Sequence, residues 1–272
     1  MTELFTVFGA DGFVGRRLVK QLTTNGHHVQ SVGRESVTSS IMNDLGHVMY
    51  CAGVTGSRFK TEQFNVVDAH VSAMSKILER GRYSSFLYMS SARVYEESLA
   101  DTSESASFKV NPHDISDFYN LSKLMGESLI LNSGISEARI ARVSYAVDFA
   151  DDSSDNISNF IREALAGEVR FSAHRKSTKD YVVMDDILEM MPKIAVHGKS
   201  SIYNLASGHN VSTDEIADLL VSETGCRVKF DEGEMLRCPR SINVSLLENE
   251  FSYQPQRLLD YARRVIRGAK KS

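Results

Sequence analysis

Short apolar runs alternate with amphipathic segments along the first 150 residues. The apolar runs are nearly continuous, which indicates strands that are buried on both faces of a parallel sheet. The segments between them repeat apolar residues at helical spacing, and two of these segments end at Gly26 and Gly81. The pattern predicts strands at 4–9, 28–34, 47–53, 85–95 and 138–147, and helices at 13–26, 64–81 and 118–134.

The pattern is looser after residue 148, where a polar and acidic stretch begins. It predicts a helix at 160–166, a strand and a helix within 170–195, a strand at 202–207, a helix at 213–225 capped by Thr213, and a last helix from about 256 to 268. We expect an α/β fold with a Rossmann-type doubly wound parallel sheet. Residues 1–150 are expected to form a dinucleotide-binding domain, and residues 151–272 a smaller, interleaved substrate-binding region that partly returns to the sheet.

Composition narrows the class of partner. The chain has 272 residues, 42% of them apolar, and a formal net charge of −4, so no basic field favours nucleic acid or an anionic membrane. No apolar stretch has the length of a membrane span. Three cysteines stand far apart, without the spacing of a metal site. We expect a cytoplasmic protein that binds a small molecule, with no nucleic-acid, membrane or metal partner.

The stretch FGADGFVG, at residues 8–15, joins the first strand to the first helix. Gly9, Gly12 and Gly15 stand three residues apart around Phe13 and Val14. A dinucleotide needs a tight turn here, a backbone that can approach its pyrophosphate, and the free N–H groups of a helix N-terminus. One glycine would serve a plain strand–helix turn, so three at this spacing favour a nucleotide site.

The end of the second strand is expected to meet the adenosine ribose. Arg34 stands there, followed by Glu35 and Ser36. An arginine suits the 2′-phosphate of NADP, whereas an acid suits the free 2′-hydroxyl of NAD. We favour NADP on account of Arg34, and Glu35 keeps NAD open as the alternative.

Two further stretches predict chemistry. Ser90 and Ser91 end a predicted parallel strand, at the edge where α/β sheets bind ligands. Tyr119 and Lys123 stand four residues apart, on one face of a predicted helix. A nearby ammonium favours the phenolate and so lowers the pKa of a tyrosine, which allows the phenol to act as an acid and base near neutral pH.

Together these motifs resemble the extended short-chain dehydrogenase/reductase family, the NAD(P)-dependent epimerase/dehydratase group that acts mainly on nucleotide sugars. GADGFVG is similar to its glycine turn, SSARVY to its S-S-x-x-V-Y stretch, and YNLSK to its YxxxK motif. The resemblance implies that Ser91 is the catalytic serine, Tyr119 the acid/base, and Lys123 the residue that binds ribose and lowers the pKa of Tyr119. It also implies cofactor contacts from the strand end Cys51, Ala52 and Gly53, and from Asn65 on the following helix.

The same resemblance implies substrate contacts in the second half of the chain. Asn156, Lys179, Arg237 and Arg240 match positions that contact the diphosphate of a nucleotide sugar, although each could instead be a solvated surface residue. The sequence departs from the family pattern at Tyr145, where an asparagine is common near the nicotinamide, and at Lys179, where an arginine is common. The family's habit also implies a homodimer formed through the helices at 64–81 and 118–134.

The two residues that follow Ser91 narrow the class of reaction that we expect. The family's 4,6-dehydratases carry an acid pair directly after the catalytic hydroxyl, whereas this chain has Ala92 and Arg93 after Ser91. We therefore expect no dehydration, which leaves a reductase or an epimerase. Because Arg34 favours NADP, we expect a nucleotide-sugar 4-keto reductase. The alternatives are an epimerase with retained NAD, a reductase or isomerase of a non-sugar carbonyl compound, and a non-catalytic NAD(P)-binding regulator. His70 and Arg142 are expected to be buried structural residues.

Overall fold

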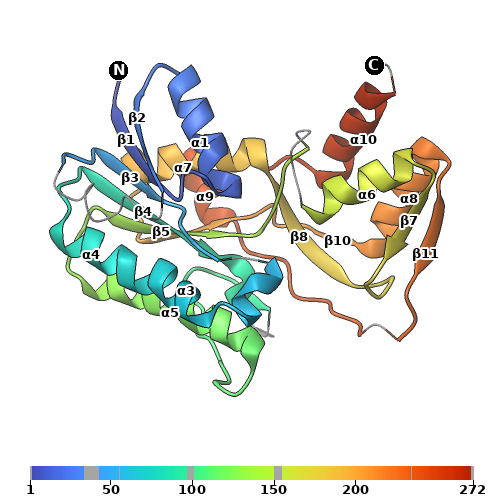
Figure 1. The fold of residues 1–272 in the computed structure, drawn as a ribbon, viewed down its shortest axis with the longest axis horizontal. Helices are drawn as coiled ribbons and strands as arrows, with labels where there is room; N and C mark the ends of the chain where they lie inside the picture. Colours follow the sequence, from blue (N-terminus) through green and yellow to red (C-terminus); the bar gives the residue numbers. More distant parts are fainter. Residues whose placement is uncertain are drawn as a thin grey trace. The chain divides into compact units, whose positions relative to one another are not determined.

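The apolar runs predicted as strands lie side by side in a six-stranded sheet of order β2-β1-β3-β4-β5-β9 (Figure 1). The pairs β1–β2, β1–β3, β3–β4 and β4–β5 are all parallel. The strands are β1 (Leu4–Phe8), β2 (His28–Val32), β3 (His47–Tyr50), β4 (Ser85–Ser91), β5 (Ala138–Val143) and β9 (Ile202–Leu205). The predicted Rossmann-type α/β fold is confirmed.

The computed structural model describes residues 2–33, 43–54, 56–96, 101–149, 155–233 and 235–270. They divide into two compact units that are each built from several stretches of chain. The first unit comprises Met1–Val94, Ser107–Val143 and Leu188–Asn204, and the second comprises Tyr95–Ala106, Ser144–Ile187 and Leu205–Ser272.

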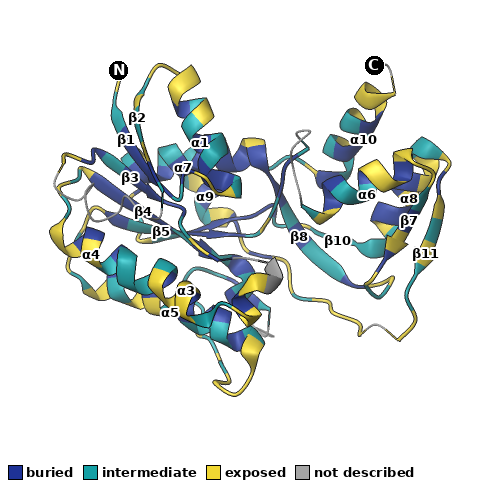
Figure 2. Ribbon diagram, viewed as in Figure 1, coloured by how far each residue is buried: buried dark blue, intermediate teal, exposed yellow. Residues whose placement is uncertain are grey.

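Helices cover both faces of the six-stranded sheet, with α4 and α5 on one face and α1 and α7 on the other (Figure 1). The helices are α1 (Phe13–Thr24), α3 (Gln63–Val67), α4 (Ala73–Arg80), α5 (Ile115–Asn132), α6 (Asn156–Leu165), α7 (Met184–His197), α8 (Thr213–Thr224), α9 (Ser245–Phe251) and α10 (Leu258–Ala269). Tyr50, Phe86 and Tyr88 are among the largest buried side chains between the sheet and α4 and α5. Figure 2 shows the result, a sheet that is mostly buried beneath helices with exposed outer faces. No helix in the described ranges has the length and apolar character needed to cross a membrane.

The order of the strands places the ends of β1 and β3 next to each other. The chain runs from β1 to β2 on one side and then returns to add β3 on the other side of β1. Such a reversal leaves a crevice at the carboxyl ends of the two central strands, which is where ligands bind in open α/β sheets. Among the described residues β2 is an edge strand, in keeping with the short connection between the second and third strands of the sequence.

The helix predicted over 64–81 is confirmed as one helical run from Gln63 to Arg80, but a regular α-helical course through it is wrong. The run comprises α3, the π-helical turn η3 (Asp68–Ser72) and α4. A π turn accommodates one extra residue without ending the helix, so the apolar periodicity continues through it and hides it from the sequence. The turn buries His70 completely.

The single strand predicted over 138–147 is also wrong. It ends at Val143, and after Ser144 the chain forms β6 (Tyr145–Val147), which belongs to a second sheet of order β10-β8-β6. The Ser144 hydroxyl donates to the buried Asp180 carboxylate at 2.7 Å. Asp180 also accepts hydrogen bonds from Ser207 and from the His209 N–H, so it joins β8 (Thr178–Val183) to two loops of the second unit.

Capping residues place the starts of several helices at positions that differ from the predicted ones. Helix α5 begins three residues before the predicted start, because the Asp114 carboxylate accepts from the Ser116 N–H. Helix α6 begins four residues early, with Asp155 as its cap. The cap of α8 is Ser212 instead of Thr213, and it forms a reciprocal capping box with Glu215.

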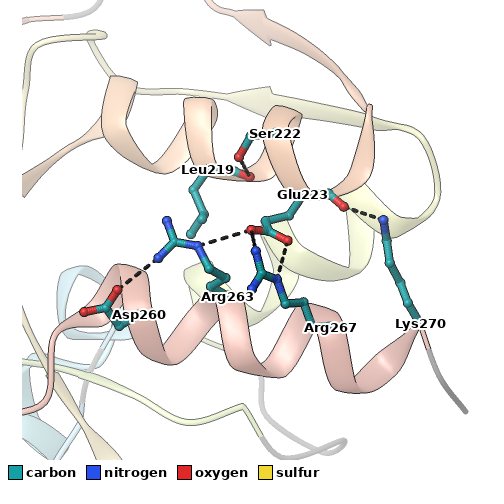
Figure 3. Close-up of polar contacts among 7 residues, drawn as sticks. All are labelled: Leu219, Ser222, Glu223, Asp260, Arg263, Arg267 and Lys270. Carbon is teal, nitrogen blue, oxygen red and sulfur yellow. Dashed lines mark hydrogen bonds and ion pairs between the residues drawn. The ribbon is translucent and has the colours of Figure 1, made fainter.

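The second unit packs α6, α8 and α10 around a core of its own, which includes Phe171, Leu220 and Ile266. Its other elements are β7 (Glu168–Phe171), β10 (Asn210–Ser212), β11 (Arg227–Phe230) and α9, none of which the sequence pattern predicts. Figure 3 shows Arg263 and Arg267 of α10 converging on the Glu223 carboxylate of α8, with N–O distances of 3.2 and 2.7 Å. These guanidinium groups, Arg267 first, lower the pKa of Glu223.

Candidate active site

The glycine turn after β1 is packed too closely for side chains. Gly9 has φ +76°, and a Cβ there would lie 2.7 Å from the backbone of Ala52. A Cβ at Gly15 would lie 2.1 Å from the Gly9 carbonyl oxygen. The turn therefore needs glycine at both positions, for conformation at the first and for space at the second.

Gly12 is the N-cap of α1, and no side chain caps this helix. Phe13 begins the helix, and Val14 is buried behind it. The N–H groups of the first helical turn thus carry the positive end of the helix dipole without a capping acceptor, an arrangement that suits a phosphate. These features fit the pyrophosphate of a dinucleotide as the sequence predicts.

The segment after β3 connects this turn to the predicted lysine. Cys51 is buried and donates its N–H to the Phe8 carbonyl oxygen at 2.9 Å, and Ala52 packs against Gly9. A Cβ at Gly53 would lie 3.7 Å from Nζ of Lys123. The glycine turn, the strand end and the lysine are therefore contiguous within the first unit.

Lys123 is only 2% exposed, and its ammonium donates to the Met89 carbonyl oxygen at 2.9 Å. Nζ also lies 5.0 Å from the centre of the Tyr88 ring. Burial lowers the pKa of Lys123 to about 8, so it is mostly charged at neutral pH. Burial has the opposite effect on the neighbouring thiol and raises the pKa of Cys51 to about 12, so Cys51 is neutral.

Tyr119 lies one helical turn before Lys123 on α5 and is 6% exposed. Its ring packs against Phe59, with ring centres 5.5 Å apart, and the Arg93 guanidinium lies 5.4 Å from its centre. The Arg93 guanidinium thus packs on the face of the Tyr119 ring, a cation–π contact. The sequence missed Phe59 and the placement of Arg93, because both contacts depend on tertiary packing.

Ser91 and Ser90 differ in their surroundings at the end of β4. Ser91 is half-buried, and its hydroxyl accepts from the Arg93 N–H at 3.2 Å. Ser90 is buried and donates to Glu127 at 2.5 Å, and Glu127 forms a buried ion pair with Arg142 at 2.7 Å. Ser91 is thus the more accessible of the two serines. Arg142 is buried and paired, as predicted.

The two other predicted cofactor residues are Asn65 and Arg34. Asn65 is exposed on α3 and donates to Glu62 at 3.1 Å. Arg34 lies outside the described residues. At the end of β2, the Asp11 carboxylate lies 2.9 Å from the position of a Cβ at Gly33. Asp11 is not among the residues that the sequence motifs predict to bind the cofactor.

The predicted substrate residues all belong to the second unit. Asn156 is exposed at the first position of α6. Lys179 lies on β8, with Nζ 4.6 Å from the centre of the Tyr145 ring, whose hydroxyl donates to Glu96 at 3.0 Å. Arg237 and Arg240 are exposed in a segment that runs beside β8, where the Thr178 N–H donates to the Arg237 carbonyl oxygen. Within the described ranges, no three His, Cys, Asp or Glu side chains gather as metal ligands would.

Gly15→Ala tests whether the glycine turn binds a dinucleotide. The added Cβ must displace the Gly9 carbonyl, so we expect the affinity for both NADPH and NADH to fall by roughly tenfold or more. Gly268→Ala on α10 is the control, because its Cβ would meet nothing within 4 Å. Both proteins are titrated by coenzyme fluorescence, and wild-type affinity in Gly15→Ala would contradict the assignment.

Lys123 predicts a pH dependence of stability. Its pKa is about 8 in the fold against 10.5 for an unperturbed lysine, so between these pH values the unfolded chain binds more protons. The free energy of unfolding of the wild type, relative to Lys123→Met, should therefore rise with pH by about 3 kcal/mol over this window. Denaturant titrations without coenzyme at pH 7.5, 9 and 10.5 measure it. A difference that is constant or falls with pH would contradict a buried, charged lysine.

Comparison with known proteins agrees with this geometry. The family model described as NAD dependent epimerase/dehydratase family matches residues 5–206. A search of curated proteins found no significant match.

Solved structures share the fold at low sequence identity. MoeE5, in complex with UDP-glucose and NAD, has a TM-score of 0.78 at 18% identity, covering 98% of this chain and 99% of its own. RMD from Pseudomonas aeruginosa, complexed with NADPH, has a TM-score of 0.75 at 20% identity and 97% coverage of both chains. The UDP-glucose 4-epimerase of Thermotoga maritima, with UDP-glucose, has a TM-score of 0.75 at 15% identity and 98% coverage of both. With the glycine turn, the strand order and the family match in agreement, the chain belongs to the NAD dependent epimerase/dehydratase family.

Proposed function

We propose that this chain is an NADP-dependent oxidoreductase that reduces a keto group of a nucleotide sugar, as a 4-keto reductase does. The observation that carries the proposal is the contiguity of the glycine turn, the strand end at Ala52 and Gly53, and the buried ammonium of Lys123. A phosphate-binding turn alone would suit any nucleotide-binding protein. A retained tyrosine and lysine beside it favour an enzyme over a non-catalytic regulator.

In the proposed reaction, residues of the first unit have separate roles. When bound, the coenzyme supplies the hydride. Tyr119 gives its phenolic proton to the oxygen of the reduced carbonyl, and Ser91 donates a hydrogen bond that holds this oxygen. Lys123 has three ammonium protons, of which the Met89 carbonyl accepts one, so others are available to a ribose hydroxyl. Its charge, with that of Arg93, stabilises the phenolate that Tyr119 leaves behind.

Dehydration is disfavoured by the residues that follow Ser91. Ala92 has no acidic group, and the Arg93 guanidinium lies over the rings of Phe59 and Tyr119, at 4.9 and 5.4 Å from their centres. Removing water across two sugar carbons needs a general acid and a general base, and a cation packed on aromatic rings supplies neither. Simple hydride transfer with proton transfer by Tyr119 needs no further group.

A nucleotide sugar is the substrate class that the second unit favours. Asn156, Lys179, Arg237 and Arg240 bring one amide and three cations toward a diphosphate in this proposal. The complexes of MoeE5 and of the Thermotoga epimerase with UDP-glucose support the same class. A non-sugar carbonyl compound would not need these phosphate-directed groups.

Two residues of opposite charge, Arg34 and Asp11, bear on the coenzyme preference. Arg34 suits the 2′-phosphate of NADP, and the RMD complex with NADPH is consistent with that choice. The Asp11 carboxylate beside Gly33 is the observation that favours the second candidate, an epimerase with retained NAD, because an acid suits a free ribose hydroxyl.

The assembly expected from the sequence is a homodimer, in the cytoplasm. Exposed apolar side chains on α3 and α5 support it, with Phe64 92% and Met125 58% exposed. Burying such side chains against a second copy would remove them from water.

Tyr119→Phe tests the mechanism. Without the phenolic proton, turnover should fall roughly a hundredfold or more, while the Kd of NADPH stays near that of the wild type. The assay follows oxidation of NADPH and NADH with a panel of 4-keto nucleotide sugars, and Tyr83→Phe, which removes a hydroxyl outside the cluster, is the control. Full activity in Tyr119→Phe would overturn the proposed role of this residue.

Arg34→Ala and Asp11→Asn test the coenzyme preference. Loss of the guanidinium should weaken the binding of NADPH by roughly tenfold or more and leave the binding of NADH nearly unchanged. Asp11→Asn should strengthen the binding of NADPH, because it removes a negative charge near the 2′-phosphate. Equal effects of Arg34→Ala on the two coenzymes would refute the NADP preference and leave the NAD-dependent epimerase as the favoured candidate.

A further inference from the structure

A buried imidazole joins the segment after β3 to the helix that carries Tyr119. His70 is 0% exposed and lies in the π turn between α3 and α4. Its Nε2 accepts from the Val54 N–H at 3.3 Å, and its Nδ1 is 2.8 Å from the Ser122 hydroxyl on α5. A Cβ at Gly53 would lie only 2.9 Å from Nε2, so the imidazole also packs directly on the strand end.

The hydrogen bonds around His70 are consistent with one tautomer. Because Nε2 accepts from the Val54 N–H, the proton of the neutral ring is on Nδ1, which donates to Ser122. Ser122 is then free to donate its own proton to the Tyr119 carbonyl oxygen, which lies 2.7 Å away. The resulting chain runs from Val54 through His70 and Ser122 to the backbone of Tyr119, with every donor and acceptor matched.

The same imidazole touches the Tyr119 side chain. The two rings meet edge to face, with centres 5.4 Å apart and an interplanar angle of 86°. The backbone of His70 is also held, because the Tyr88 hydroxyl donates to its carbonyl oxygen at 3.3 Å. π turns occur frequently at functional sites, where the extra residue re-aims a side chain. Here the turn directs His70 toward Tyr119.

We propose that His70 is a positioning residue, which holds Tyr119 in register with the cofactor-facing segment 51–54 through Ser122. The proposal deepens the proposed function and rests on it for its kinetic consequence. A purely structural histidine would stabilise the fold without affecting the chemistry of Tyr119. A positioning histidine fixes the phenol relative to the Lys123 ammonium, so its loss changes the properties of the phenol itself.

The charge state of His70 suits this role. Burial lowers its pKa to about 2, with the nearby Lys123 ammonium as the second cause. The groups that face the imidazole are the Lys123 ammonium and the Tyr119 ring, with Tyr88 bonded to its backbone. His70 is therefore neutral near neutral pH, so protonation does not change its hydrogen bonds there.

The first test needs no substrate. The pKa of the Tyr119 phenol is measured by ultraviolet difference titration between each protein and the same protein with Tyr119→Phe. Because His70→Leu removes both hydrogen bonds of the ring, we expect it to move Tyr119 away from Lys123 and raise this pKa by about half a unit or more. An unchanged pKa in a folded His70→Leu protein overturns the proposal.

Two conservative variants each keep one end of the hydrogen-bond chain through His70, and they keep the test informative if His70→Leu misfolds. His70→Asn keeps a donor near Nδ1 for Ser122, whereas His70→Gln keeps an acceptor near Nε2 for Val54. We expect His70→Asn to retain the phenol pKa of the wild type more closely than His70→Gln does, because only the Ser122 side reaches α5. The reverse order, or equal shifts, contradicts a role that acts through Ser122.

Kinetics then test the consequence for turnover. We expect His70→Leu to lower kcat by about tenfold to a hundredfold with a small change in KM, and Ser122→Ala to lower it less. The kcat of the double variant should be no lower than that of His70→Leu, because both substitutions break the same hydrogen-bond chain. A normal kcat with only a lower Tm would make His70 structural. Full turnover in Tyr119→Phe would instead refute the proposed function, while the titration would still decide whether His70 positions Tyr119.

Discussion

The contact between Gly9 and the backbone of Ala52 is the constraint on which the candidate site depends. β1 and β3 are neighbours because the chain reverses at β1, and their ends can approach only if no Cβ separates them. This approach brings the glycine turn against the segment 51–53, and Gly53 in turn packs beside His70 and Lys123. A side chain at Gly9 would therefore disturb the glycine turn and, through the strand end, the surroundings of the lysine.

Buried polar groups then hold the site in one arrangement. An unpaired charge in the interior is costly, so each such group needs a partner. Lys123 has the Met89 carbonyl, Glu127 has Arg142 and Ser90, and His70 has Val54 and Ser122. Met89 and Ser90 lie on β4, Arg142 lies on β5 and Val54 follows β3, so these bonds lock α5 to the sheet and to the π turn. The cluster has a specific geometry because a small displacement would leave several buried groups without partners.

A buried carboxylate also organises the second unit. The carboxylate of Asp180 gathers the residue before β6 and the loop after β9, and this fixes where the second sheet begins. Its helices are held at the surface by ion pairs such as those of Glu223, which are exposed to solvent and contribute less than buried pairs. The core of α6, α8 and α10 supplies the main driving force through burial of apolar side chains.

The sequence by itself determined the class of fold, the strands of the parallel sheet, and the glycine turn, because apolar periodicity and glycine spacing are local properties. It also indicated which tyrosine, lysine and serine are the candidates for chemistry. Only the tertiary structure decided the π turn at His70, the change of sheet at Ser144, and the burial that lowers the pKa of Lys123. These features depend on groups distant in sequence, such as Met89 for Lys123 and Asp180 for Ser144, and no local pattern encodes which distant partner a side chain will meet.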